Sequence, residues 1–158
     1  MQFITKNTQE TQKLVGKIIK KLVKAPRQGA LVLALQGELG AGKTTFVQGL
    51  AQALGVKEKV LSPTFVIMKR FTIYDLCPST SLGVKFTNFY HIDAYRLTGA
   101  EDTKELDLGE ILKDKNNLVA IEWAERIAGI LPADTIWLDF QHKGGDKREI
   151  KLKVKKSK

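Results

Sequence analysis

The chain has 158 residues, of which 43% are hydrophobic, and a mean hydropathy of −0.16, so its length suits one domain and its composition argues against disorder. The longest apolar run, residues 30–35, is far shorter than the ~20 residues that a membrane span requires, and no signal segment opens the sequence. The single cysteine, Cys77, can form no internal disulfide and fits a reducing compartment. We therefore expect a cytoplasmic protein without membrane spans, folded as a single domain over residues 1–158.

The net charge of +9 is concentrated at the two ends of the chain. Basic side chains outnumber acidic ones in residues 1–29 and 147–158, whereas acidic side chains are in excess in residues 30–146. The basic ends, including a short C-terminal tail at 155–158, form either a solvated surface or a contact for RNA or an acidic partner. The sequence leaves both interpretations open.

The first third of the chain predicts a helix, a strand and a second helix. After Asn7, a candidate N-cap with a glutamate three residues on, apolar residues recur every four positions and indicate an amphipathic helix ended by Pro26. The continuously apolar residues 30–35 predict a strand covered on both faces, as in a parallel sheet. Residues 44–54 are good helix formers, and Gly55 stands where a helix would stop.

The middle of the chain alternates between loops and strands. Residues 62–65, Ser-Pro-Thr-Phe, predict a connecting loop because the proline restricts the serine to extended geometry. Strand patterns cover 66–74 and return at 84–93. The stretch between them is rich in turn residues, so we expect a loop insertion at 75–85 that either enlarges a partner surface or is simply tolerated.

The last third predicts helices separated by buried strands. Residues 97–113 have helical spacing interrupted by Gly109, which indicates two short helices or one broken helix. The apolar run 118–121 predicts a buried strand that ends on Glu122, and residues 124–131 predict a helix stopped by a proline. Two further strands, 135–140 and 148–154, are expected to pair as a hairpin.

Residues 37–44, Gly-Glu-Leu-Gly-Ala-Gly-Lys-Thr, match the nucleotide-binding pattern G-x-x-x-x-G-K-[ST] in full. The predicted strand before them and helix after them supply the context that the motif requires, because loop amides and the helix N-terminus then face the phosphates. Lys43 would reach the β- and γ-phosphates and Thr44 would bind Mg²⁺. The candidate nucleotide-binding residues of the loop are Gly37, Glu38, Leu39, Gly40, Ala41, Gly42, Lys43 and Thr44.

We therefore predict an α/β protein with three layers and a P-loop NTPase-like fold, in which helices cover both faces of a mixed, partly parallel central sheet. The tetrapeptide Asn-Lys-x-Asp that reads guanine is absent, which favours ATP over GTP.

Two carboxylates at predicted strand ends could support hydrolysis. Glu122 ends the run 118–121 and Asp93 ends the strand that precedes it, the positions at which open α/β sheets bind their ligands. One could hold the Mg²⁺ and the other could orient the attacking water. The spacing does not decide between these two assignments.

Four other residues are weaker candidates. Thr64 could sense the γ-phosphate as a switch threonine or merely cap a turn. Arg96 could bind phosphate or an acidic group of a partner, or merely pair with a surface carboxylate. We expect Trp123 to be a core or interface anchor rather than a catalytic residue. His91 has no companion ligands or nucleophile pattern, so we expect an ordinary hydrogen-bonded role for it.

Four ordered motifs together resemble the TsaE family, the bacterial ATPases of tRNA threonylcarbamoyladenosine biosynthesis. They are the P-loop at 37–45, the loop at 62–65, His-Ile-Asp-Ala-Tyr-Arg-Leu at 91–97, and Ile-Glu-Trp-Ala-Glu at 121–125. The resemblance extends from about residue 4 to about residue 152. The sequence departs from the family pattern in the long connection 66–90 and at Ala124, where proline is common in the family.

The resemblance implies a Mg²⁺-dependent ATPase that works with the TsaB and TsaD proteins, which place a threonylcarbamoyl group on the adenosine next to the tRNA anticodon. It places Lys43, Thr44 and Thr45 on the nucleotide and Mg²⁺ site and Thr64 on a switch-like loop. It also implies that Asp93 is the essential aspartate of the family. Glu122 and Trp123 match the glutamate–tryptophan pair of the family, and Trp123 joins Thr45 and Thr64 as a candidate nucleotide-binding residue. The candidate catalytic residues are then Lys43, Asp93 and Glu122, and the candidate metal ligands are Thr44, Asp93 and Glu122.

Two other classes of function compete with this interpretation. A small P-loop kinase would need an arginine-rich lid, and no such segment is evident. A binding module would use ATP as a ligand without turnover, and the two carboxylates argue against it only in part. Under the favoured interpretation, the basic ends are candidate contacts for tRNA.

Overall fold

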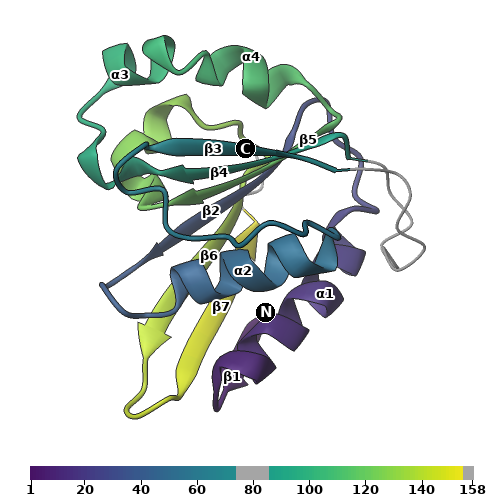
Figure 1. Cartoon of the computed structure of the whole chain (residues 1–158), viewed down its shortest axis with the longest axis vertical. Coiled ribbons are helices and arrows are strands. Elements are labelled where there is room, and N and C mark those ends of the chain that lie inside the picture. Colours follow the sequence, from purple (N-terminus) through teal and green to yellow (C-terminus); the bar gives the residue numbers. More distant parts are fainter. Residues whose placement is uncertain (74–85, 155–158) are drawn as a thin grey trace.

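The computed structural model describes residues 1–73 and 86–154, and a mixed β-sheet runs through its centre (Figure 1). The strands of this sheet are β1 (Gln2–Thr5), β2 (Leu31–Gly37), β3 (Met68–Thr72), β4 (Asn88–Asp93), β5 (Asn117–Glu122), β6 (Ile136–His142) and β7 (Arg148–Val154). The helices are α1 (Thr8–Leu22), α2 (Lys43–Ala53), α3 (Ala100–Glu105) and α4 (Leu108–Lys113), with short 3₁₀ segments η1 (Ala94–Arg96) and η2 (Ala124–Ile130).

The strand order within the described residues is β1-β7-β6-β2-β5-β4-β3. The four central strands β6, β2, β5 and β4 are parallel, whereas β1, β7 and β3 join antiparallel at the two edges. In this register Glu122 lies opposite Leu35 on one side and Asp93 on the other. The carboxyl ends of β2, β5 and β4 therefore meet at one edge of the sheet, where the P-loop also begins.

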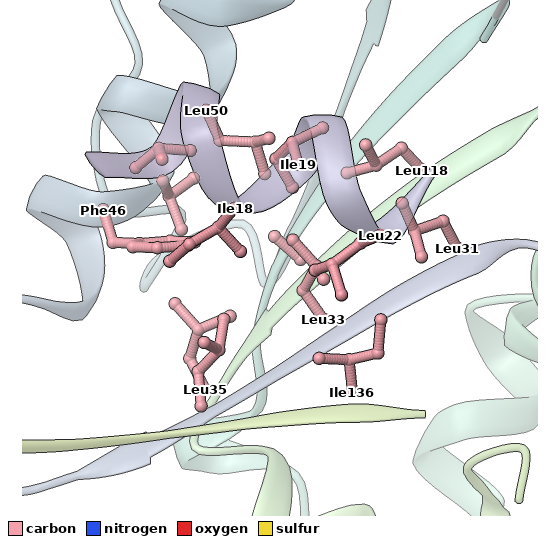
Figure 2. Close-up of a cluster of buried hydrophobic side chains, with 14 of the residues drawn as sticks. Ile18, Ile19, Leu22, Leu31, Leu33, Leu35, Phe46, Leu50, Leu118 and Ile136 are labelled. Carbon is pink, nitrogen blue, oxygen red and sulfur yellow. The ribbon is translucent and has the colours of Figure 1, made fainter. Parts of the chain in front are cut away.

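Helices cover both faces of the sheet, and each face has its own apolar cluster. In β2, Leu33 and Leu35 pack toward α1 and α2, whereas Val32 and Ala34 pack on the opposite face with residues of α4 and η2. Figure 2 shows the first cluster, with side chains of α1 and α2 above Leu33 and Leu35. Burial on both faces explains why this strand is continuously apolar, and the predicted three-layer α/β fold is confirmed.

The predicted start of the first helix is confirmed. The side chain of Asn7 accepts a hydrogen bond of 2.8 Å from the amide of Glu10, and the Glu10 carboxylate accepts one of 2.8 Å from the amide of Lys6. The two bonds together satisfy amides that no helical carbonyl can reach. Gly55, with φ 75°, follows α2 as predicted.

The prediction of a strand over 66–74 was wrong at its start. Val66 and Ile67 lie in a turn in which both amides donate to the carbonyl of Pro63, and Ile67 adopts a left-handed φ of 64°. The strand begins only at Met68. Its last predicted residue, the insertion at 75–85, the start of the 84–93 strand and the tail at 155–158 lie outside the described residues.

Three further expectations need correction. Within the predicted 84–93 strand, ladder pairing starts at Asn88. The two short helices break at Asp107, whose φ is 51°, and not at Gly109, which lies inside α4. Residues 124–131 form a 3₁₀ segment with a kink at Ile127 instead of a regular helix.

The N-terminal strand β1 was not anticipated from the sequence. It pairs with β7 and completes the edge of the sheet, whereas the hairpin of β6 and β7 was predicted and is confirmed. In the part of the chain that the structure describes, no helix is long and apolar enough to cross a membrane.

Candidate functional site

A cavity of about 580 Å³ opens at the edge of the sheet where the parallel strands end. Its walls come from the P-loop, the first turn of α2, the loop before β3, and the ends of β4 and β5. The lining residues are Leu39, Gly40, Gly42, Lys43, Thr44, Thr45, Ser62, Thr64, Asp93, Tyr95, Glu122 and Trp123. Segments distant in the sequence thus converge on one concave surface, the usual form of a small-molecule site.

The backbone of the P-loop depends on glycine at two points. At Gly37 a side chain would collide with the carbonyl oxygen of Phe140 in the neighbouring strand β6. Gly42 caps α2 with φ 101°, a left-handed conformation that side chains disfavour. Among the described residues, no side chain caps the first turn of α2. Its amides can therefore bind an anion, with the helix dipole in the favourable direction.

Lys43 is buried beside the loop that it would serve. Its Nζ donates hydrogen bonds of 2.6 Å to the carbonyl of Gly37 and 2.9 Å to that of Glu38, and it lies 3.9 Å from the centre of the Trp123 ring. Burial lowers the pKa of Lys43, and neighbouring carboxylates, Glu122 first among them, act in the opposite direction. The ammonium group is held inside the P-loop by carbonyl and π contacts.

Glu122 is buried at the end of β5 and receives contacts from two sides. The hydroxyl of Thr44, in the first turn of α2, lies 2.9 Å from both of its carboxylate oxygens. The Nε2 atom of His91, in β4, lies 2.8 Å from its Oε1. The carboxylate is thereby linked to the P-loop helix and to the neighbouring strand.

Asp93 organises the loop on the other side of the cavity. Its Oδ2 accepts hydrogen bonds of 2.8 Å from Thr64 and 3.2 Å from Ser62, and its Oδ1 caps η1 by accepting one of 2.9 Å from the amide of Tyr95. Arg96 donates to the carbonyl of Thr64. The loop is therefore attached to the end of β4 through this carboxylate and the neighbouring arginine.

Most of the residues singled out from the sequence are brought together in this cavity, but five are not among its lining residues: Gly37, Glu38, Ala41, His91 and Arg96. His91 and Arg96 lie behind the lining and contact Glu122 and Thr64. Gly37 and Glu38 meet Lys43 through their carbonyl groups, and Ala41 is buried in the apolar cluster below the loop. Ser62 and Tyr95 also line the cavity and were not predicted from the sequence. Their closeness in sequence to Thr64 and Asp93 was the available signal.

The donor set suits Mg²⁺. A hydroxyl and two carboxylates are hard oxygen ligands, and Mg²⁺ in nucleotide sites usually takes only one or two carboxylates, with phosphates and water as the other ligands. Within residues 1–73 and 86–154, no group of three or more His, Cys, Asp or Glu side chains is placed to hold a metal ion by itself. A metal here would therefore depend on Thr44, Glu122 or Asp93 together with a bound nucleotide.

Comparison with known proteins identifies relatives along nearly the whole chain. The family model described as threonylcarbamoyl adenosine biosynthesis protein TsaE matches residues 5–150. The tRNA threonylcarbamoyladenosine biosynthesis protein TsaE of Bacillus subtilis is 35% identical over 95% of this chain and 83% of its own. The protein of the same name from Streptomyces coelicolor is 41% identical over 80% and 78%. The crystal structure of Bacillus subtilis YdiB is similar, with a TM-score of 0.72 and 29% identity over 99% of this chain and 86% of that one.

Proposed function

The chain belongs to the TsaE family of threonylcarbamoyl adenosine biosynthesis proteins, and from this premise we propose that it is a Mg²⁺-dependent ATPase acting through the TsaB–TsaD pair. A role in tRNA threonylcarbamoyladenosine biosynthesis follows from the family itself. ATP turnover, the metal and the partner proteins are our proposal. The observation that carries it is the contact of Thr44 with Glu122, because it joins the P-loop to a strand-end carboxylate.

The P-loop residues would bind the phosphates of ATP. The uncapped amides of α2 supply hydrogen-bond donors, and Lys43 would exchange its bonds to the carbonyls of Gly37 and Glu38 for bonds to the β- and γ-phosphates. To reach the phosphates, the side chain of Lys43 would need only to change rotamer, because its ammonium group already lies against the loop. Trp123 lies over the ammonium group and shields it from water.

Glu122 and Asp93 would have different tasks. The carboxylate of Glu122 accepts a hydrogen bond from the hydroxyl of Thr44, the P-loop residue expected to bind Mg²⁺. We therefore assign Glu122 to the metal. When bound, Mg²⁺ would neutralise charge on the phosphates. Asp93 contacts the hydroxyls of Ser62 and Thr64, so we assign it to the switch-like loop and to the orientation of the attacking water.

The loop that Asp93 holds also offers a route by which a partner could control the site. Phe65 is 92% exposed directly after Thr64, and Leu39 in the P-loop is 89% exposed. Large apolar side chains exposed beside a cavity are typical of contact surfaces. A partner that covers Phe65 would fix the position of Thr64 and, through it, that of Asp93.

A contact with tRNA through the basic ends is the remaining part of the proposal. The lysines of α1 that point to solvent form one basic surface with Lys24, just beyond the helix; they are Lys13, Lys17, Lys20 and Lys21. Such a surface attracts phosphates without reading sequence, and its affinity would fall steeply with salt.

The decisive experiment measures phosphate release from ATP by the purified chain, alone and with its cognate TsaB–TsaD pair. Lys43→Ala is the blank, because it removes the phosphate-binding cation. Stimulation by the pair supports a partner-gated ATPase. ATP binding without any release in either condition would instead favour a nucleotide-dependent binding module.

A further inference from the structure

His91 is a polar residue at a position that packing alone would give to an apolar one. It lies in β4 between Tyr90 and Ile92, with a relative exposure of 0%. Ala120 is its partner in β5, and Phe89, two residues earlier in β4, belongs to the apolar cluster below α1 and α2. This histidine has no role in the nucleotide site that we propose.

The hydrogen bonding of the ring is one-sided. Nε2 lies 2.8 Å from Oε1 of Glu122, and a carboxylate only accepts hydrogen bonds, so Nε2 is the donor. Nδ1 is buried, and no hydrogen-bond partner for it exists among the described residues. Leaving a buried nitrogen unpaired is unfavourable. The histidine is therefore poorly explained as a stabilising core residue, and its one favourable side-chain contact with a polar group in residues 1–73 and 86–154 is the bond to Glu122.

Two donors hold the Glu122 carboxylate from different elements. Thr44 approaches from α2 at 2.9 Å, and His91 approaches from β4. A carboxylate at the end of a flexible side chain can rotate about its last bond when one donor holds it, whereas two donors on separate rigid elements fix its plane. The donor from the strand stays in place even if Thr44 turns its hydroxyl toward a metal.

We infer that His91 is a positioning residue for Glu122: its Nε2–H holds Oε1, so that the carboxylate keeps its orientation toward Thr44 and toward the metal that these two residues would serve. The inference rests on the proposed function, since it assigns a task to Glu122 in a Mg²⁺–nucleotide site. Donors behind metal ligands typically change metal affinity by about 10- to 100-fold when they are removed.

The test compares three substitutions of His91 that differ in where they place a donor. In His91→Gln the amide nitrogen can reach the position of Nε2, in His91→Asn it reaches only the position of Nδ1, and His91→Leu has no donor. We expect ATP binding without Mg²⁺ to be similar in all of them. The tightening of ATP binding by Mg²⁺ should fall by about tenfold or more in His91→Leu and His91→Asn and survive in His91→Gln.

Phe89→Leu is the matched control. Phe89 is also fully buried in β4 and stacks on Phe71, with ring centres 5.6 Å apart, so its truncation loosens the same core without a change at Glu122. Thermal unfolding of every variant reports the loss of stability. Phe89→Leu should lose stability and keep the wild-type response to Mg²⁺. An equal loss of the Mg²⁺ response in Phe89→Leu would overturn the positioning role.

A second readout does not need nucleotide or metal. ¹⁵N NMR of the histidine rings in the wild-type protein should show that His91 carries its hydrogen on Nε2, and Glu122→Gln should shift that signal while the signal of His142 stays in place. If the wild-type protein binds no ATP, the proposed function fails, and this spectrum still decides whether the pair exists. A wild-type Mg²⁺ response in His91→Leu, or equal behaviour of the Asn and Gln variants, would overturn the inference.

Discussion

Thr44 and Glu122 are 78 residues apart in the chain, and the hydroxyl of the first lies 2.9 Å from both carboxylate oxygens of the second. The contact exists because β2 and β5 are parallel neighbours, with Leu35 opposite Glu122, and because the P-loop returns the chain to the end of this pair as α2. It defines the centre of the candidate site.

Replacing each of the two strand-end carboxylates by its amide should impair a different step, the response of ATP binding to Mg²⁺ for Glu122 and phosphate release for Asp93. Glu122→Gln should bind ATP but lose most of the gain in affinity that Mg²⁺ provides, because the residue faces Thr44. Asp93→Asn should keep the Mg²⁺ response and lose phosphate release by about 100-fold or more, because it faces the loop. Calorimetric titration of each variant with ATP, with and without Mg²⁺, measures the first effect, and an assay of phosphate release measures the second. The reverse pattern would exchange the two roles.

Thr64→Val keeps the shape of the side chain and removes the hydroxyl that donates to Asp93 at 2.8 Å. We expect phosphate release to fall by about tenfold, the effect of losing one oriented catalytic contact, while ATP affinity stays within about twofold. Ser62→Ala, which removes the longer 3.2 Å bond to the same carboxylate, should have a smaller effect. Equal rates for wild type and Thr64→Val would show that the hydroxyl merely shapes the turn.

Phe65→Ser tests whether the exposed side chain beside the cavity contacts a partner. Since Phe65 is 92% exposed, its replacement should leave the stability of the chain within about 0.5 kcal/mol. Basal phosphate release should be unchanged, while the concentration of TsaB–TsaD needed for half-maximal stimulation should rise by about tenfold or more. Val154→Ser, at another exposed apolar residue, is the control. Normal stimulation of Phe65→Ser would place the contact elsewhere.

Leu33→Ala should lower the free energy of unfolding by about 3 kcal/mol, within the range of 2–5 kcal/mol for such core truncations. Leu33 is fully buried in the central strand and packs below α1 and α2 (Figure 2). Urea unfolding followed by circular dichroism measures the change. Leu61→Ala, at a side chain that is 59% exposed, should change stability by less than about 0.5 kcal/mol. If Leu33→Ala lowered the free energy of unfolding by less than about 1 kcal/mol, the surrounding core would have closed around the cavity left by the truncated side chain.

Glu149→Gln should reduce stability in a pH-dependent way. The ammonium groups of Lys143 and Lys151, which lie 3.0 Å and 3.3 Å from Oε2 of Glu149, hold the pKa of this carboxyl below its ordinary value of 4.5. The ionised group therefore stabilises the fold above about pH 4.5, and this contribution is lost as the pH falls through the lowered pKa. The difference in unfolding free energy between wild type and Glu149→Gln should be largest near neutral pH and vanish in acid.

The control for this pH series is Glu110→Gln. It breaks an ion pair with Lys113 in which both side chains are about three-quarters exposed, so it should change stability little at any pH. Urea unfolding between pH 3 and pH 7 compares the two variants. If the difference in unfolding free energy between wild type and Glu149→Gln stayed constant over that range, the contacts with Lys143 and Lys151 would not act through the charge of Glu149.

Features that depend on neighbouring residues were predicted well. The two-sided apolar strand β2, the capped start of α1, the P-loop and the β6–β7 hairpin all follow from patterns within short stretches of sequence. The error at the start of β3 occurred where the hydrogen bonds of a turn override the strand preference of the side chains. Val66 and Ile67 have strand-forming side chains, but the carbonyl of Pro63 draws both amides into a turn.

The sequence by itself thus determined the class of fold, the P-loop motif and the two acidic strand ends, because each is encoded by residues adjacent in the chain. Only the tertiary structure decided which of them meet: Thr44 with Glu122, Thr64 with Asp93, and His91 behind Glu122. These pairs depend on the order and register of the strands. That order comes from burial of both sheet faces, a property of the whole chain that no single segment carries.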